Sequence, residues 1–339
     1  MSRSAVALVA CIVALALVPL FAEKFYVQFF AKIIIMAILA MSLDLLLGYA
    51  GLVSFGHAAF YGAAGYALAL ATPQFQAASF WTSLPLAVAA SALLALAIGF
   101  FVVRTRGIYF IMVTLAFAQM LFFLFYDTKI AGGNDGIYID ARPVADIAGW
   151  RPFSLDDYRH VYWLALAFLA AVYVLLRTVL RSPFGRAIAG IRVNEQRMIS
   201  LGYATFRYKL ACFVLSGAIA GIAGYLAAVQ FGVVNPETLG WHLSAAVMMM
   251  VILGGMGTLL GPVLGAAAWM LLELGLQGLP DAGGVNLGKH WQLFMGLFIV
   301  VATLVLPHGI VGLARSLRRP AERSLDKLGT NDGLGTNDG

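Results

Sequence analysis

Long apolar segments separated by short polar breaks run along almost the whole chain. A membrane-spanning helix needs about 20 predominantly apolar residues, whereas the strands of a membrane barrel are shorter and alternate apolar with polar positions. The pattern therefore predicts an all-α, polytopic integral membrane protein with about ten transmembrane helices. These helices are expected at residues 5–21, 27–47, 56–72, 82–103, 107–126, 161–180, 208–231, 242–254, 258–278 and 291–312.

Two of the apolar segments, 56–72 and 242–254, are short or rich in glycine. They are predicted to be broken or tilted helices, which a bilayer tolerates only where they are buried in protein. The first segment, 5–21, follows a basic residue and has two interpretations. The sequence PLFAEKF after it places bulky residues where a signal-peptide cleavage site requires small ones, so a retained first helix is favoured.

The chain is divided into three regions on this basis. Residues 1–24 form the first transmembrane helix and a short outer loop, and residues 25–315 form the transmembrane domain. Residues 316–339 form a tail that is first basic and then contains two copies of LGTNDG. The repeat has no apolar periodicity and many turn-forming residues, so it is predicted to be disordered.

Charged residues are scarce and unevenly distributed. The 339 residues are 62% hydrophobic and 11% charged, whereas soluble domains contain roughly 25% charged residues. The net charge of +6 is concentrated in a few short segments, so no nucleic-acid partner is expected. Ten crossings place the basic segments 104–106, 177–209 and 315–327 on the same side, which the positive-inside rule identifies as the cytoplasm. Both termini are then cytoplasmic, and the aspartate-rich loop 127–160 lies outside.

The polar segment 181–211 interrupts the apolar pattern but carries the signals of a helix. Ser182 suits the N-cap, Pro183 the first helical position, and Gly202 the position just after the end. An amphipathic helix between two spans rests its apolar side on lipid headgroups or on a docked protein, and the docked protein is favoured. The polar rim of this contact is assigned to Arg186, Arg192, Glu195 and Arg197, and its apolar anchors to Ile188 and Ile191.

Polar side chains also occur within predicted spans. Residues 48–65 combine glycines, a serine, a histidine and aromatic residues at the junction of two spans, which is typical of a helix break that lines a cavity. A structural hydrogen bond to backbone is favoured for His57, and interhelical hydrogen bonds are the commoner role of polar groups such as Thr114 and Gln119. The candidates for a translocation pathway are Ser54, His57, Thr114 and Gln119.

Glycines recur at the spacing that lets helices approach closely. Helix packing is assigned to Gly217, Gly221, Gly257, Gly261 and Gly265, and packing within the chain is favoured over a dimer contact. The sequence GGVNLGKH at 283–290 resembles a phosphate-binding loop but has a histidine where a hydroxyl is required. The two cysteines lie in apolar segments. No catalytic residue, metal site or cofactor is therefore expected.

Several blocks taken together resemble one family. They are GYAGLVSFGHAAFYG, RGIYFIMVTLAFAQM, AGGNDGI, SPFGRAIAGIRVNEQR, LGYATFRYKLACFVLSGAIAGIAG and ILGGMGTLLGPVLGA. Between residues 30 and 315 they resemble successive blocks of the LivM-type permease, one of two related membrane subunits of the branched-chain amino acid ABC importer. The resemblance implies a non-enzymatic, multi-pass protein of the bacterial inner membrane. Its implied partners are a second permease subunit of the LivH type, two cytoplasmic ABC ATPases that hydrolyse ATP, and a periplasmic substrate-binding protein.

The coupling element of this family corresponds to residues 185–202, which supports the docked protein over the lipid surface. Gly190 departs from the family pattern. A glycine inside a helix costs up to about 1 kcal/mol relative to alanine, so a kink or split is expected there.

The alternatives concern the substrate and the source of energy. Relatives of this architecture carry urea, short amides or aromatic acids. A secondary transporter that works without an ATPase is less favoured, because it should show a coupling-ion site or an inverted repeat, and neither is apparent.

Overall fold

The computed structural model describes Pro19 and residues 23–72, 77–128, 131–139, 141–146, 153–278, 290–305 and 309–313. The predicted first helix and the tail with its repeat lie outside these residues. The helices are α2 (Lys24–Asp44), which continues as a π-helix (Leu45–Ala50), α3 (His57–Ala71), α4 (Phe80–Val102), α5 (Ile108–Asp127), α6 (Tyr158–Arg181), α7 (Pro183–Val193), α8 (Glu195–Ser200), α9 (Thr205–Phe231), α10 (Trp241–Gly254), α11 (Gly261–Gln277) and α12 (Trp291–Val305).

Very little of the described chain is extended. The strands β1 (Ile137–Tyr138) and β2 (Val233–Val234) form one short antiparallel pair. Short 3₁₀ turns occur at Gly133–Asp135 and Pro236–Leu239. The prediction of a mostly helical protein is therefore confirmed.

Within the described part of the chain, six helical stretches are long and apolar enough to cross a membrane. They are Lys24–Ala50, Phe80–Val102, Ile108–Asp127, Tyr158–Arg181, Thr205–Phe231 and Trp291–Leu313. The segments expected at 56–72, 242–254 and 258–278 also form helices, namely α3, α10 and α11, but these contain only 15, 14 and 17 residues. A helix rises 1.5 Å per residue, so these three are short for a hydrocarbon core of about 30 Å.

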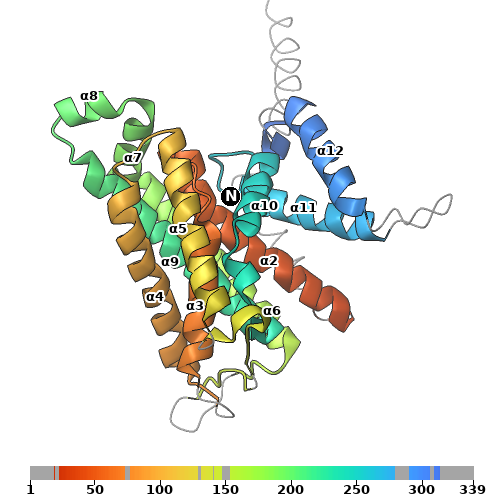
Figure 1. Cartoon of the computed structure of the whole chain (residues 1–339). Coiled ribbons are helices and arrows are strands. Elements are labelled where there is room, and N and C mark those ends of the chain that lie inside the picture. Colours follow the sequence, from red (N-terminus) through yellow and green to blue (C-terminus); the bar gives the residue numbers. More distant parts are fainter. Residues whose placement is uncertain are drawn as a thin grey trace, which may run out of the picture.

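Two central helices are covered by helices that expose apolar side chains. Most of α2 and α9 is buried, whereas α4, α5, α6 and α12 are largely exposed. Figure 1 shows α11 and α12 on the opposite side of α2 from α3 and α4. Exposed apolar side chains such as Leu93, Phe101, Met112 and Phe123 lie on α4 and α5, as expected for helices that face lipid.

Three glycines on one face of α9 allow close helix contacts. A Cβ atom on Gly217 would lie 2.4 Å from the Cβ of Ala95 on α4, and one on Gly221 would lie 2.6 Å from the Cβ of Ser91. A Cβ on Gly224 would lie only 1.9 Å from the carbonyl oxygen of Tyr61 on α3. The contacts of Gly217 and Gly221 are thus within the chain, and Gly224, which the sequence analysis missed, makes a closer approach than either.

The other three glycines assigned to helix packing have different surroundings. Gly257 is not in a helix: it lies in the turn between α10 and α11 with a φ of 71°. Gly261 is the first residue of α11, where a Cβ would lie 2.3 Å from the carbonyl oxygen of Gly255 in the same turn. Gly265 does lie between helices, since a Cβ there would be 1.8 Å from the carbonyl oxygen of Met250 on α10. The helix-packing assignment is therefore corrected for Gly257 and Gly261.

The segment 183–202 is two helices rather than one. Ser182 caps the start of α7 by accepting the Gly185 N–H, and Pro183 is the first residue, as predicted. The break falls at Asn194, whose backbone is extended and whose side chain accepts the Arg197 N–H at 3.0 Å, capping α8.

The split expected at Gly190 is wrong in position. Gly190 lies inside α7, and a Cβ there would be 2.9 Å from the sulfur of Met198. Its missing side chain makes room for α8 to fold back against α7. Gly202 follows α8 with a φ of 85°, which agrees with its predicted place after the helix end.

Candidate functional site

The first polar cluster surrounds the break before α3. Gly51 ends the π-helix with a φ of 72°, and residues 51–56 form no helix. The buried hydroxyl of Thr114 on α5 accepts the Phe55 N–H at 3.2 Å, and that of Ser244 on α10 accepts the Ala58 N–H at 2.9 Å. These side chains attach the start of α3 to two neighbouring helices.

Of the other predicted pathway residues, Ser54 belongs to this cluster and Gln119 does not. Ser54 is buried, and its hydroxyl accepts the Gly56 N–H at 3.2 Å, so it stabilises the broken stretch locally. Gln119 lies more than one turn beyond Thr114 on α5 and is half-buried. None of the hydrogen bonds around the break involves Gln119. The structure thus brings Ser54, His57 and Thr114 together and leaves Gln119 apart.

His57, the first residue of α3, is fully buried. Its Nε2 lies 2.8 Å from the hydroxyl of Ser216 on α9, and that hydroxyl donates to the Ser42 carbonyl on α2. A serine hydroxyl has a single proton to donate. His57 must therefore donate from Nε2, which leaves Nδ1 as a bare acceptor, and Nδ1 has no hydrogen-bond partner among the described residues. The side chain links three helices at one point.

The second polar cluster holds the α7–α8 segment, residues 183–202, against the bundle. The Glu195 carboxylate lies 2.7 Å from the Lys209 ammonium at the start of α9 and 3.2 Å from the Arg106 guanidinium between α4 and α5. Burial alone would raise the pKa of Glu195, but the hydrogen bond and charge of Lys209, the charge of Arg106 and a hydrogen bond from Thr205 together lower this pKa below its usual value. Glu195 is therefore an ionised carboxylate near neutral pH.

The apolar residues of the α7–α8 segment divide into an inner and an outer group. Ile188 and Ile191 are 1% and 5% exposed and belong to the core of the chain. They attach α7 to the bundle and are unavailable to another protein, which corrects their assignment as anchors of an external contact. The outer group is Val193, Ile199 and Leu201, of which Val193 is 87% exposed.

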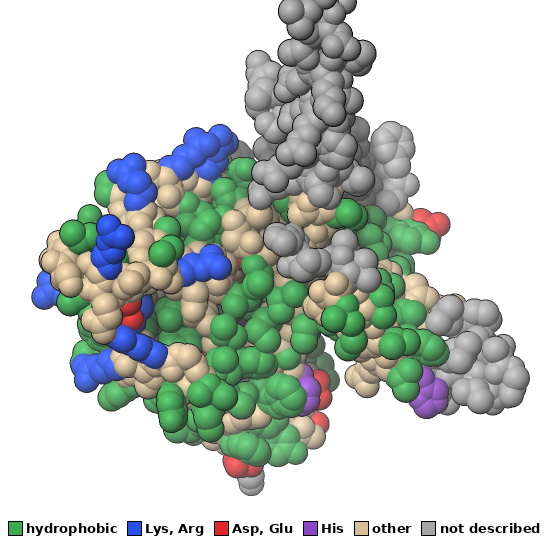
Figure 2. Space-filling model, turned by 90° about the horizontal axis from the view of Figure 1, so that it is seen from above, with side chains coloured by type: hydrophobic (Ala, Val, Ile, Leu, Met, Phe, Trp, Pro, Cys, Tyr) green, Lys and Arg blue, Asp and Glu red, His purple; other side chains and the backbone are tan. Residues whose placement is uncertain are grey.

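Basic side chains gather on the same end of the molecule. Figure 2 shows this end with its lysine and arginine side chains concentrated over the α7–α8 half. Arg186 and Arg197 are exposed there. Arg192 is exposed as well, but unlike the other two its guanidinium donates to the carbonyl oxygen of Gly48 in the π-helix.

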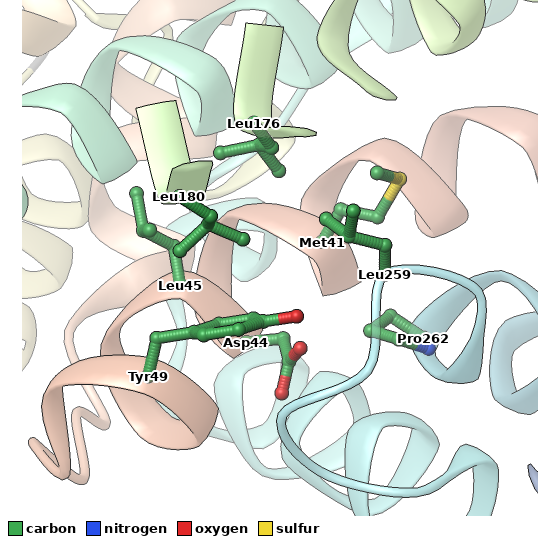
Figure 3. Close-up of a pocket in the computed structure, with 8 residues that line it drawn as sticks. All are labelled: Met41, Asp44, Leu45, Tyr49, Leu176, Leu180, Leu259 and Pro262. Atoms are coloured by element: carbon green, nitrogen blue, oxygen red, sulfur yellow. The ribbon is translucent and has the colours of Figure 1, made fainter. Parts of the chain in front are cut away.

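Asp44 lies beside this contact and is 2% exposed. Its carboxylate accepts the Gly257 N–H at 2.8 Å, so it holds the α10–α11 turn against the end of α2. Asp44 and Tyr49 border a small pocket whose other walls are apolar, as Figure 3 shows. The apolar lining residues are Met41, Leu45, Leu176, Leu180, Leu259 and Pro262. No group of three or more His, Cys, Asp or Glu side chains that could hold a metal occurs within the described part of the chain.

These features define a multi-pass helical membrane protein with a polar helical pair outside its apolar bundle. Residues 25–304 match the family described as branched-chain amino acid transport system, permease component, and the chain belongs to this family. The resemblance found in the sequence is therefore confirmed.

The curated relatives include proteins named for more than one substrate. The high-affinity branched-chain amino acid transport system permease protein LivM of Salmonella typhimurium is 31% identical over 316 residues, covering 88% of this chain and 72% of the relative. LivM of Escherichia coli K12 is 31% identical over 327 residues, covering 91% and 75%. The autoinducer 2 import system permease protein LsrC of Shigella flexneri is 28% identical over 248 residues, covering 70% and 68%. No solved structure matches the chain significantly.

Proposed function

We propose that this chain is a transmembrane permease subunit of a binding-protein-dependent ABC importer for branched-chain amino acids. It forms half of the translocation pathway, and partner ATPases supply the energy by hydrolysing ATP. The observation that carries the proposal is the family match over residues 25–304, together with 31% identity to LivM over most of the chain.

The proposed topology has ten crossings, both termini in the cytoplasm, and the protein in a bacterial inner membrane. The ion pair between Arg106 and Glu195 supports an even number of crossings between these two residues, because it places them at the same end of the bundle. The helices α5 and α6, each long enough to span, lie between them in the sequence. The concentration of basic residues at this end favours the cytoplasmic side.

The proposed ATPase contact is the outer surface of the α7–α8 segment. Its centre consists of the exposed apolar residues Val193, Ile199 and Leu201, and Arg186 and Arg197 stand at its rim. An apolar centre with a polar rim is the usual anatomy of a protein interface, and arginine is common in such interfaces. The exposed apolar residues therefore fit a docked ATPase better than they fit water.

The proposed pathway runs past the break before α3, where Ser54, His57 and Thr114 meet. A discontinuous helix with polar side chains near it is typical of transport sites at membrane depth. The remaining partners are a second permease of the LivH type, which completes the pathway, and a periplasmic binding protein that docks on the outer loops, including 127–160.

The proposed substrate follows from the named relatives. Identity to LivM favours branched-chain amino acids, whereas the LsrC match shows that related permeases are named for other solutes. Urea, short amides and aromatic acids are the alternatives within the same architecture, and an ATPase-independent secondary transporter is the alternative outside it.

The test is capture of a tagged chain from gently solubilised native membranes, followed by mass spectrometry of the proteins retained. Recovery of a second permease and two ATPases is expected. The variant Leu201→Asp should lose the ATPases because it places a charge in the apolar centre of the contact. Tyr138→Asp, which changes an equally exposed side chain on β1, should retain them. Recovery of the chain alone, under conditions that keep a known ABC importer intact, would favour the secondary transporter.

A further inference from the structure

Arg192 belongs to the outer α7–α8 segment, yet its side chain turns toward the membrane helices. Its guanidinium donates to the Gly48 carbonyl, and its aliphatic part crosses Gly51, where a Cβ would lie 3.0 Å from the Arg192 Cγ. The last carbonyls of a helix lack partners within the helix, and a cation is favourable at that end. Arg192 therefore caps the C-terminal end of the helix formed by α2 and its π-helical extension.

The same helix end contacts the turn between α10 and α11. The Asp44 side chain accepts the Gly257 N–H, and a Cβ on Gly257 would lie 3.1 Å from the Gly48 carbonyl oxygen and 3.8 Å from the Arg192 Nη1. The approach depends on Gly48, since a Cβ there would lie 2.4 Å from the Gly257 nitrogen. Arg192, Gly48, Asp44 and Gly257 thus form one continuous set of contacts, which we call the Arg192 junction.

Both segments that meet at this junction, the end of α2 and the α10–α11 turn, have backbone that differs from a regular α-helix. Leu45–Ala50 is a π-helix, a form that is rare and often found at functional sites. Gly51 and Gly257 both have positive φ values, 72° and 71°. The junction therefore joins α7 to two places where membrane helices are interrupted.

We propose that Arg192 is a positioning residue that transmits movement of the α7–α8 segment to the end of α2 and to the α10–α11 turn. This role differs from the ATPase contact assigned to its neighbours Arg186 and Arg197. Ile188 and Ile191 also attach α7, but apolar contacts permit sliding, whereas a charge-assisted hydrogen bond is directional. The inference rests on the proposed function, because only a docked ATPase would move this segment.

The first experiment compares Arg192→Met, Arg192→Lys and the control Arg177→Met in the complete importer, reconstituted in liposomes with its ATPases and binding protein. Arg177 is an exposed arginine one turn before the end of α6. Arg192→Met should keep the ATPases bound and hydrolysis near the wild-type rate, while uptake falls by about tenfold because coupling is lost. Arg192→Lys should recover part of the uptake, since an ammonium also donates to a carbonyl. Arg177→Met should behave as wild type.

The second experiment replaces the hydrogen bond with a covalent link. A Cβ on Gly51 would lie 3.8 Å from the Arg192 Cβ, which matches the separation in disulfides. The double variant Gly51→Cys, Arg192→Cys should hydrolyse ATP without uptake when reduced and regain uptake when oxidised. Arg192→Cys alone should not respond to oxidation, and Gly51→Cys alone measures the effect of a side chain at the φ of 72°. This experiment also decides the question if Arg192→Met does not fold.

Three results would overturn the inference. Loss of the ATPases from Arg192→Met would place Arg192 in the external contact, and unchanged uptake would show that the junction transmits nothing. Oxidation of the double cysteine variant without recovery of uptake would show that the two segments must separate during transport. Failure of the proposed function is distinguishable, because the wild-type chain itself would then retain no ATPase.

Discussion

Replacing Gly224 with alanine should separate α9 from α3. The added Cβ would lie 1.9 Å from the carbonyl oxygen and 2.7 Å from the carbonyl carbon of Tyr61. Both atoms are backbone, so no side-chain rotation relieves the contact. Helix α9 would have to move by about 1.5 Å for the shorter distance to reach ordinary van der Waals contact.

The cost has two parts. Adding a methyl group to a well-packed core costs typically 1–3 kcal/mol. A shift of α9 away from α3 also stretches the hydrogen bond between His57 and Ser216, now 2.8 Å, whose loss costs about 1 kcal/mol. Gly224→Ala should therefore lower the free energy of unfolding by about 2–4 kcal/mol.

The assay is thermal unfolding of the purified chain in detergent, followed by the loss of its monodisperse chromatographic peak. A loss of this size should lower the midpoint by about 3–6 °C. The matched control is Gly275→Ala on α11, where no described atom lies within 4 Å of the added Cβ. Because alanine favours a helix by up to about 1 kcal/mol over glycine, this control should unfold at or above the wild-type temperature. Equal midpoints for the two variants would refute the close-packing argument.

Three further predictions concern the two polar clusters. Gly202→Val should uncouple ATP hydrolysis from uptake, because valine is strained at the φ of 85° although nothing lies within 4 Å of a Cβ at this position. Gly202→Asn should be tolerated better, because asparagine adopts positive φ more readily, and unchanged transport by the valine variant would count against docking at this segment. Glu195→Gln should lower the thermal midpoint at pH 7. The pKa of Glu195 is lower in the folded chain than its usual value of 4.5, so the ionised carboxylate stabilises the fold above that pH and the contribution is lost on protonation at lower pH. The difference in midpoint between variant and wild type should therefore vanish as the pH falls below 4.5, and a difference that persists at pH 3 would contradict this. Ser216→Ala should cost about 1–3 kcal/mol in unfolding free energy by leaving the buried His57 Nε2–H unpaired, whereas Thr178→Ala, which removes an exposed hydroxyl, should cost much less.

The positions of the helices could largely be predicted because hydropathy determines them directly. A span must be apolar over its whole length, so the runs at 82–103 and 161–180 locate α4 and α6 to within a few residues. The short α3 and α10 were likewise visible as short or glycine-rich runs. The π-helical end of α2 was not predicted, and its contacts with α7 and with the α10–α11 turn join segments far apart in the sequence.

The break in the α7–α8 segment shows where helix propensity alone misleads. Gly190 is the weaker helix former, but its lack of a side chain serves the packing of Met198 and does not end the helix. Asn194 ends it because its side chain can cap the next helix, and the acidic Glu195 that follows is also favourable in a first turn. The sequence contained this signal. Treating the segment as one helix led to Ile188 and Ile191 as the anchors and left the exposed Val193, Ile199 and Leu201 unassigned.

Arg192 marks a different limit of sequence reasoning. Helical periodicity places it among the polar residues of α7, together with arginines that do face outward. Its partner is a backbone carbonyl 144 residues away in the sequence, so no side chain in either segment identifies the pair. Charge distribution therefore indicates which end of the bundle is basic, but the structure is needed to show which cation binds the end of a membrane helix. That distinction separates the residues that we propose to bind the ATPase from the one that we propose to carry its movement into the membrane.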